Sequence, residues 1–287
     1  FRPGVAERLG LGSESLMQKH PSLIYCSISG FGQDGPMRDF PAIDQVIQSV
    51  SGLMLLSGHE GEPAERIGFP IVDTYSALLS AFAILSAVLQ RERDPKRKGQ
   101  VIDVSMLDAT MVMMSAVVGP MMLSGQTPTR AGNRGFSGAP TADTFPTGDG
   151  EITIGAVQQV QVERLFRTLD CMDLLADERF ATPDARLAND MALRELLLAR
   201  FATRTAIEWE TDLAAAGVPA GKVRPLKEAM DMPQVESRDL FLDLPDGSKI
   251  LNAGFRFEHD GPSLNANAPD LGADTDSVLN KLRQTAR

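Results

Sequence analysis

The chain has 287 residues, 43% of them hydrophobic and 23% charged, as in a soluble globular protein with one large domain or two smaller ones. Its net charge of -10 argues against a nucleic-acid partner, because no basic face could dominate the surface. The two cysteines, Cys26 and Cys171, predict no disulfide framework, so we expect a reducing compartment and a cytoplasmic location. The three histidines lack metal-ligand spacing, and we expect no metal site.

The first 124 residues predict a parallel sheet covered by helices. Because apolar, β-rich segments alternate with helical patterns, we expect an α/β fold. The most apolar stretch, 77–89, is shorter than a bilayer-spanning helix, so we expect a buried helix and no membrane partner. The expected strands and helices lie at 12–20, 22–29, 44–56, 75–88, 100–106 and 107–123.

The composition changes after Ser124. Residues 125–137 are rich in Gly, Pro and Thr and predict a linker between a large domain at 1–124 and a smaller α/β domain at 138–230. Residues 231–287 are expected to return to the large domain. The elements expected beyond the linker lie at 151–156, 160–169, 184–202, 206–216, 241–244, 249–257 and 274–283.

Asp73 precedes the small and apolar run that predicts a helix over 75–88. A carboxylate at a helix N-terminus faces unpaired N–H groups and the positive end of the helix dipole, both of which favour its ionised form. An ionised, well-oriented carboxylate can act as a nucleophile. The alternative is that Asp73 is simply the N-cap of the helix, and the local sequence alone favours that alternative.

Five segments resemble family III CoA-transferases, in the same order and with the same spacing. They are FRPGVAERLGLG, SLIYCSISGFGQDGP, FPIVD, KGQVIDVSMLDA and APDLGADTDSVLNKL. The family includes formyl-CoA and carnitine CoA-transferases, and α-methylacyl-CoA racemase is related to it. The resemblance implies a Rossmann-like large domain lacking roughly the family's first hundred residues, a smaller α/β domain, and an interlocked homodimer.

The resemblance implies that Asp73 is a catalytic nucleophile. Its carboxylate would attack an acyl-CoA thioester, giving a mixed anhydride and a CoA thiolate that then forms an aspartyl-CoA thioester. An incoming carboxylic acid would reverse these steps. The substrates are therefore an acyl-CoA and a small carboxylic acid, and no prosthetic group or metal is implied.

The resemblance also implies contacts with CoA at the start of the chain and around the PAID segment. An arginine guanidinium suits this ligand because it can stack on adenine or bind a phosphate. Asp44 is expected beside the active centre as a second catalytic residue, with a helix cap as the alternative. For Arg8 the alternative is an exposed helix charge. The expected CoA contacts are Phe1, Arg2, Arg8, Phe40, Ala42 and Ile43.

Two departures from the family bear on the reaction and its substrate. Racemases of this superfamily carry a histidine where Ile43 stands here, and since isoleucine cannot accept a proton, a two-base racemisation lacks one base. The glycine run of formyl-CoA transferases is absent, which disfavours formyl or oxalate specificity. Arg134 could meet an acceptor carboxylate or hold a turn. An acyl-CoA racemase or isomerase, and a non-catalytic acyl-CoA-binding fragment, remain alternatives to a CoA-transferase.

Overall fold

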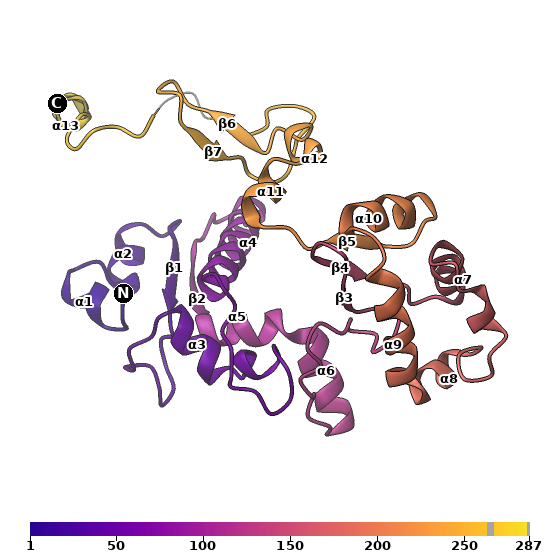
Figure 1. The fold of residues 1–287 in the computed structure, drawn as a ribbon. Coiled ribbons are helices and arrows are strands. Elements are labelled where there is room, and N and C mark those ends of the chain that lie inside the picture. Colours follow the sequence, from indigo (N-terminus) through magenta and orange to yellow (C-terminus); the bar gives the residue numbers. More distant parts are fainter. Residues whose placement is uncertain (263–266, 286–287) are drawn as a thin grey trace. The chain divides into compact units, whose positions relative to one another are not determined.

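The structure is a computed structural model that describes residues 1–262 and 267–285. It divides into two compact units, Phe1–Asp143 and Thr144–Arg287. Each unit combines helices with small sheets (Figure 1), which confirms the α/β class expected from the sequence. The finer organisation into a large domain, linker, small domain and return segment stays a prediction.

The first unit is built on two parallel strands, β1 (Ile24–Ser29) and β2 (Gln100–Ser105). Their register pairs Ile24 with Gln100 and Ser29 with Ser105. The chain between them includes α4 (Ile71–Arg93), which packs against both strands (Figure 1). The alternation of strands and helices predicted for this part is therefore confirmed. The other elements are α1 (Val5–Arg8), α2 (Ser13–Lys19), α3 (Asp44–Val50), η1 (Leu53–Leu55), α5 (Met106–Met113) and α6 (Ser115–Ser124).

Helix α4 is longer and more exposed than the sequence predicted. It has 23 residues, and by length and apolar composition alone it could cross a membrane. The expectation of a short segment was wrong because residues flanking the apolar stretch continue the helix at both ends. The expectation of burial was wrong as well. One stripe of the helix is more than half exposed, at Leu78, Phe82, Leu85 and Leu89.

Three predicted helices or strands are shorter than expected. The helix predicted at 44–56 ends at Val50, because Gly52 has a left-handed backbone (φ 82°) from which η1 then begins. The helix predicted at 107–123 breaks at Met114 into α5 and α6, which meet at 76°. The strand predicted at 249–257 is limited to β7 (Lys249–Leu251).

The second unit contains an antiparallel sheet in the order β3-β4-β5 and an antiparallel pair, β6-β7. The helix predicted at 184–202 is divided at Asn189, whose backbone (φ -114°, ψ 30°) leaves the helical range and whose side-chain amide donates to the Ala185 carbonyl at 2.9 Å. The elements are β3 (Thr144–Pro146), β4 (Glu151–Ile154), α7 (Gln159–Thr168), η2 (Met172–Leu175), α8 (Pro183–Ala188), α9 (Asp190–Phe201), α10 (Ala206–Ala215), β5 (Ala220–Lys222), α11 (Leu226–Met230), α12 (Pro233–Glu236), β6 (Phe241–Asp243), β7 and α13 (Thr275–Thr285).

Aromatic side chains form the centre of the second unit's core. Phe201 is fully buried, stacks on Phe145 with ring centroids 5.1 Å apart, and meets Trp209 edge-on at 5.8 Å. The Trp209 indole N–H donates to the Phe201 carbonyl at 3.0 Å, so its one polar atom is satisfied despite burial. The core is therefore tied together by α9, α10 and β3.

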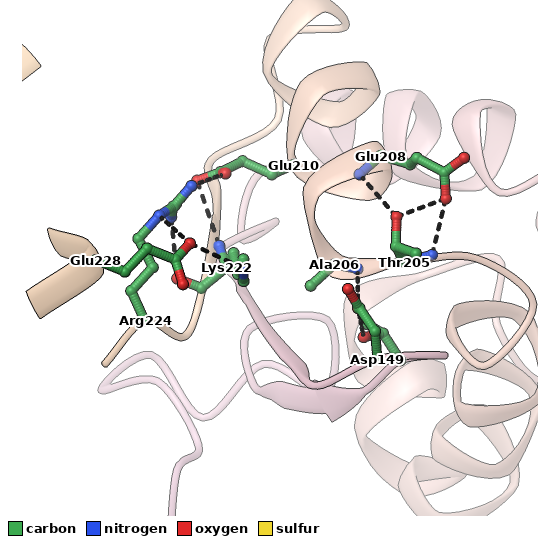
Figure 2. Close-up of polar contacts among 9 residues, drawn as sticks. Asp149, Thr205, Ala206, Glu208, Glu210, Lys222, Arg224 and Glu228 are labelled. Atoms are coloured by element: carbon green, nitrogen blue, oxygen red, sulfur yellow. Dashed lines mark hydrogen bonds and ion pairs between the residues drawn. The ribbon is translucent and has the colours of Figure 1, made fainter. Parts of the chain in front are cut away.

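Polar contacts fix the N-terminus and the middle of α10 (Figure 2). At its N-terminus Thr205 and Glu208 form a reciprocal capping box, and the Asp149 carboxylate accepts from the Ala206 N–H at 2.7 Å. Further along α10, the Glu210 carboxylate pairs with the Arg224 guanidinium, just beyond β5. The same arginine lowers the pKa of Glu210, chiefly through its hydrogen bonds.

Candidate active site at the N-terminus of α4

Helix α4 begins without a side-chain cap of its own. Pro70 is the N-cap residue, and proline supplies no capping oxygen and no N–H. The Thr74 hydroxyl donates back to the Pro70 carbonyl at 2.8 Å, which closes the first turn. Asp73 lies in that turn as the third helical residue, so its carboxylate does not cap the helix.

The missing cap comes from another helix. One carboxylate oxygen of Asp44, Oδ2, accepts from the Val72 N–H at 2.8 Å and from the Asp73 N–H at 3.1 Å. Asp44 is the first residue of α3, so it caps α4 and not the helix to which it belongs. Two of the unpaired N–H groups at the start of α4 are thereby satisfied.

The side chain of Asp73 is exposed, and no hydrogen bond or ion pair within the described part of the chain holds its carboxylate. Partial burial, and then the negative charge of Asp44, raise the pKa of Asp73 above its usual value. The sequence-based expectation that the N-terminus of the helix favours ionised Asp73 therefore left out two opposing influences, burial and the Asp44 charge. The result is an unpaired carboxylate whose affinity for a proton is increased.

A pocket of about 600 Å³ lies in the first unit, at the carboxyl end of β1. Arg2 and Arg38 supply its positive charge. Gly30 is required at its wall, because a Cβ there would lie 2.2 Å from the Cβ of Ala42. Five of the six residues expected to contact CoA line this pocket: Phe1, Arg2, Phe40, Ala42 and Ile43.

The remaining predicted residues lie outside the pocket lining. Arg8 is exposed on α1, and its guanidinium lies over Gly4. Asp44 directly follows the lining residue Ile43 and turns to the N-terminus of α4, as described above. Arg134 forms an ion pair with Asp143 at 3.3 Å, which is consistent with a structural role.

Sequence reasoning missed several lining residues, among them Ile28, Ser29, Arg38, Val46 and Met106. One signal could have found three of them. Ile28 and Ser29 end β1, and Met106 directly follows β2. In parallel sheets the carboxyl ends of the strands form the ligand crevice, so residues at both strand ends were candidates.

The residues described by the structure contain no group of three or more His, Cys, Asp or Glu side chains able to hold a metal ion. The start of α4 carries one unpaired carboxylate, Asp73, and one capping carboxylate, Asp44, while the pocket at the end of β1 carries two arginines.

Comparison with known proteins identifies the family. The sequence model of CoA-transferase family III matches residues 1–275, and the chain belongs to this family. It is 33% identical over 267 residues to the acetyl-CoA:oxalate CoA-transferase of Acetobacter aceti, covering 91% of this chain and 68% of that protein. It is 32% identical over 294 residues to the succinate–glutarate CoA-transferase of Agrobacterium fabrum, covering 96% and 71%.

The fold agrees with the same assignment. The crystal structure of a CAIB/BAIF family protein from Brucella suis superimposes with a TM-score of 0.87 at 33% identity, covering 98% of this chain and 74% of that one. The family III membership predicted from the five sequence segments is confirmed. The chain belongs to a class of enzymes that transfer CoA.

Proposed function

We propose that the chain moves CoA from an acyl-CoA to a carboxylic acid through a covalent intermediate on Asp73. The observation that carries this proposal is a link between the pocket and Asp73. Ile43 lines the pocket, and the next residue, Asp44, binds the backbone N–H of Asp73. The link supports a CoA thioester in the pocket approaching the start of α4.

In the first half-reaction, a carboxylate oxygen of Asp73 attacks the acyl-CoA carbonyl and expels the CoA thiolate, leaving a mixed anhydride. The thiolate then attacks the aspartyl carbonyl and releases the donor acid, which leaves with one oxygen from Asp73. In the second half-reaction, the acceptor carboxylate attacks the aspartyl-CoA thioester, and the freed thiolate attacks the acceptor carbonyl of the new anhydride. Each step exchanges one acyl bond for another, so no oxidant or metal is required.

The pocket suits the nucleotide part of CoA. Its volume of about 600 Å³ lies within the range of ligand sites in proteins. Arg2 and Arg38 can pair with phosphates through their guanidinium groups, and Phe1 and Phe40 offer faces for adenine. We assign Phe1, Arg2, Phe40, Ala42 and Ile43 to CoA binding on this basis.

The acceptor is best sought among short dicarboxylic acids. Relatives at about 30% identity have names that include oxalate, glutarate, D-citramalate and mesaconate. All four are small diacids, and fold similarity alone does not select one, although the missing glycine run disfavours oxalate. We further propose a homodimer and a cytoplasmic location, as expected from the resemblance and the cysteine content.

The test is mass spectrometry of the protein after incubation with a panel of acyl-CoA donors, with borohydride trapping. We expect a CoA adduct or a reduced side chain at Asp73, and its loss in Asp73→Ala. The matched control is Asp108→Ala, because Asp108 is also an exposed aspartate in the first turn of a helix, α5. A folded protein that forms no adduct with any donor would refute the covalent mechanism and favour an acyl-CoA-binding fragment.

A further inference from the structure

We infer that Gln48 is a positioning residue for Asp73, acting through the carboxylate of Asp44. This inference rests on the proposed role of Asp73 as the nucleophile. It follows from a chain of hydrogen bonds that begins at a buried amide in α3 and ends at the backbone of Asp73.

Gln48 is fully buried, which is unusual for an amide side chain on a short helix. Both ends of its amide are paired. The Nε2 group donates to Asp44 Oδ1 at 2.6 Å, and Oε1 accepts from the Ile67 N–H at 2.9 Å. A buried amide is costly unless it is hydrogen-bonded, so this geometry holds Gln48 in one orientation.

The two oxygens of the Asp44 carboxylate therefore have different hydrogen-bond partners. Oδ1 is held by Gln48, and Oδ2 is left to accept from the N–H groups of Val72 and Asp73. Without the Gln48 amide, the carboxylate could rotate about its bond to Cβ and leave the start of α4. Gln48 therefore fixes the orientation in which Asp44 caps α4.

Gln48 also holds the chain that leads into α4. Its Oε1 binds the N–H of Ile67, and the segment from Ile67 to Pro70 connects directly to the first helical turn. Gln48 thus holds the backbone directly at Ile67, before the helix, and through Asp44 at the first turn of the helix. Since no described contact holds the Asp73 carboxylate itself, its position depends on this backbone.

These hydrogen bonds therefore restrict the position of the proposed nucleophile, Asp73. A displacement of about 1 Å at a reacting group can lower the rate by about two orders of magnitude. Loss of the Gln48 amide should therefore slow the attack of Asp73 on the thioester, with little effect on CoA binding. Gln48 is absent from the pocket lining, which separates the two effects.

Three variants test the inference. Gln48→Met removes both hydrogen bonds at similar side-chain length. Gln48→Glu keeps an acceptor for the Ile67 N–H, and it covers the case in which Gln48→Met does not fold. Gln45→Met makes the first substitution on the exposed face of the same helix and is the matched control.

The measurements are amide hydrogen exchange at Val72 and Asp73, the single-turnover rate of the Asp73 adduct, and the dissociation constant of CoA. For Gln48→Met we expect faster exchange at both amides and a rate lower by about 10- to 100-fold. The dissociation constant should stay within about twofold, as a change confined to the transition state requires. Gln45→Met should match the unsubstituted protein in all three.

Gln48→Glu adds a readout that a merely structural role would not change. When neutral, the introduced carboxyl can donate to Asp44 and accept from Ile67, as the amide does. When ionised, it cannot donate and repels the Asp44 carboxylate. The rate of Gln48→Glu relative to the unsubstituted protein should therefore rise as the pH falls, whereas the relative rate of Gln48→Met stays flat.

The inference is overturned if folded Gln48→Met matches Gln45→Met in adduct rate and in exchange at Val72 and Asp73. A flat relative rate for Gln48→Glu across pH would also overturn it. Absence of any adduct in the unsubstituted protein would refute the proposed function, while the exchange data would still decide whether Gln48 holds the cap. The two failures are thus distinguishable.

Discussion

Replacing Asp44 with alanine should destabilise the first unit by about 2–4 kcal/mol. Loss of a helix cap costs about 0.5–2 kcal/mol, and here the cap serves the N–H groups of Val72 and Asp73. The same substitution leaves the buried Gln48 amide donor without its partner, at about 1–3 kcal/mol. The two losses share one carboxylate, so they should not add fully.

The assay is urea unfolding followed by far-UV circular dichroism, with amide exchange at the start of α4. Fluorescence is a poor probe here, because the only tryptophan, Trp209, lies in the core of the second unit. Asp34→Ala is the control, since Asp34 is exposed and lies outside the cap. If Asp44→Ala and Asp34→Ala unfolded within about 0.5 kcal/mol of each other, the capping account would be wrong.

Three further predictions concern other features of the two units. Ser76→Ala should stabilise the protein by about 1 kcal/mol, because the Ser76 hydroxyl is buried without a hydrogen-bond partner among the described residues. Ser80→Ala is its control, since the Ser80 hydroxyl donates to the Ser76 carbonyl at 2.7 Å and its removal should lower stability. The argument would be contradicted if both variants lost the same free energy of unfolding. Phe201→Ala should cost about 3–5 kcal/mol in urea unfolding, with a smaller loss for Phe201→Leu. Asp44→Asn should shift the acidic limb of the adduct-rate profile to lower pH, because the charge that helps raise the pKa of Asp73 is removed; a shift to higher pH would refute that cause.

Regular elements of the first unit could be predicted because their patterns are local. The β-rich segments that became β1 and β2 lie close to the predicted bounds, and their parallel pairing follows from the helices between them. The exposure of α4 could not be predicted in this way. An apolar run indicates a helix, but whether its stripe at Leu78 and Phe82 is covered depends on what packs there.

The candidate site was predicted in part. The resemblance brought Phe1 and Arg2 together with the PAID segment, and the structure places both in one pocket. The role of Asp44 was not predictable from spacing, because it caps a helix that begins 27 residues further along the chain. Gln48 gave no signal either, since a glutamine on a short helix is ordinarily solvated and only the fold shows its burial.

The central claim is that Asp73 carries CoA, and an oxygen-transfer experiment tests it most directly. The protein is turned over with an unlabelled acyl-CoA and an acceptor acid whose carboxylate oxygens are heavy isotopes, and is then digested with trypsin. Residues 67–91 form one tryptic peptide in which Asp73 is the only acidic side chain, so a label there has one possible location.

Because the acceptor carboxylate forms an anhydride with Asp73 and leaves one oxygen behind in each turnover, we expect this peptide to gain one heavy oxygen in the first turnover and up to two after many turnovers. Asp108→Ala should behave in the same way. Net CoA transfer with an unlabelled 67–91 peptide would contradict the account, because CoA would then pass between the acids without a bond to Asp73.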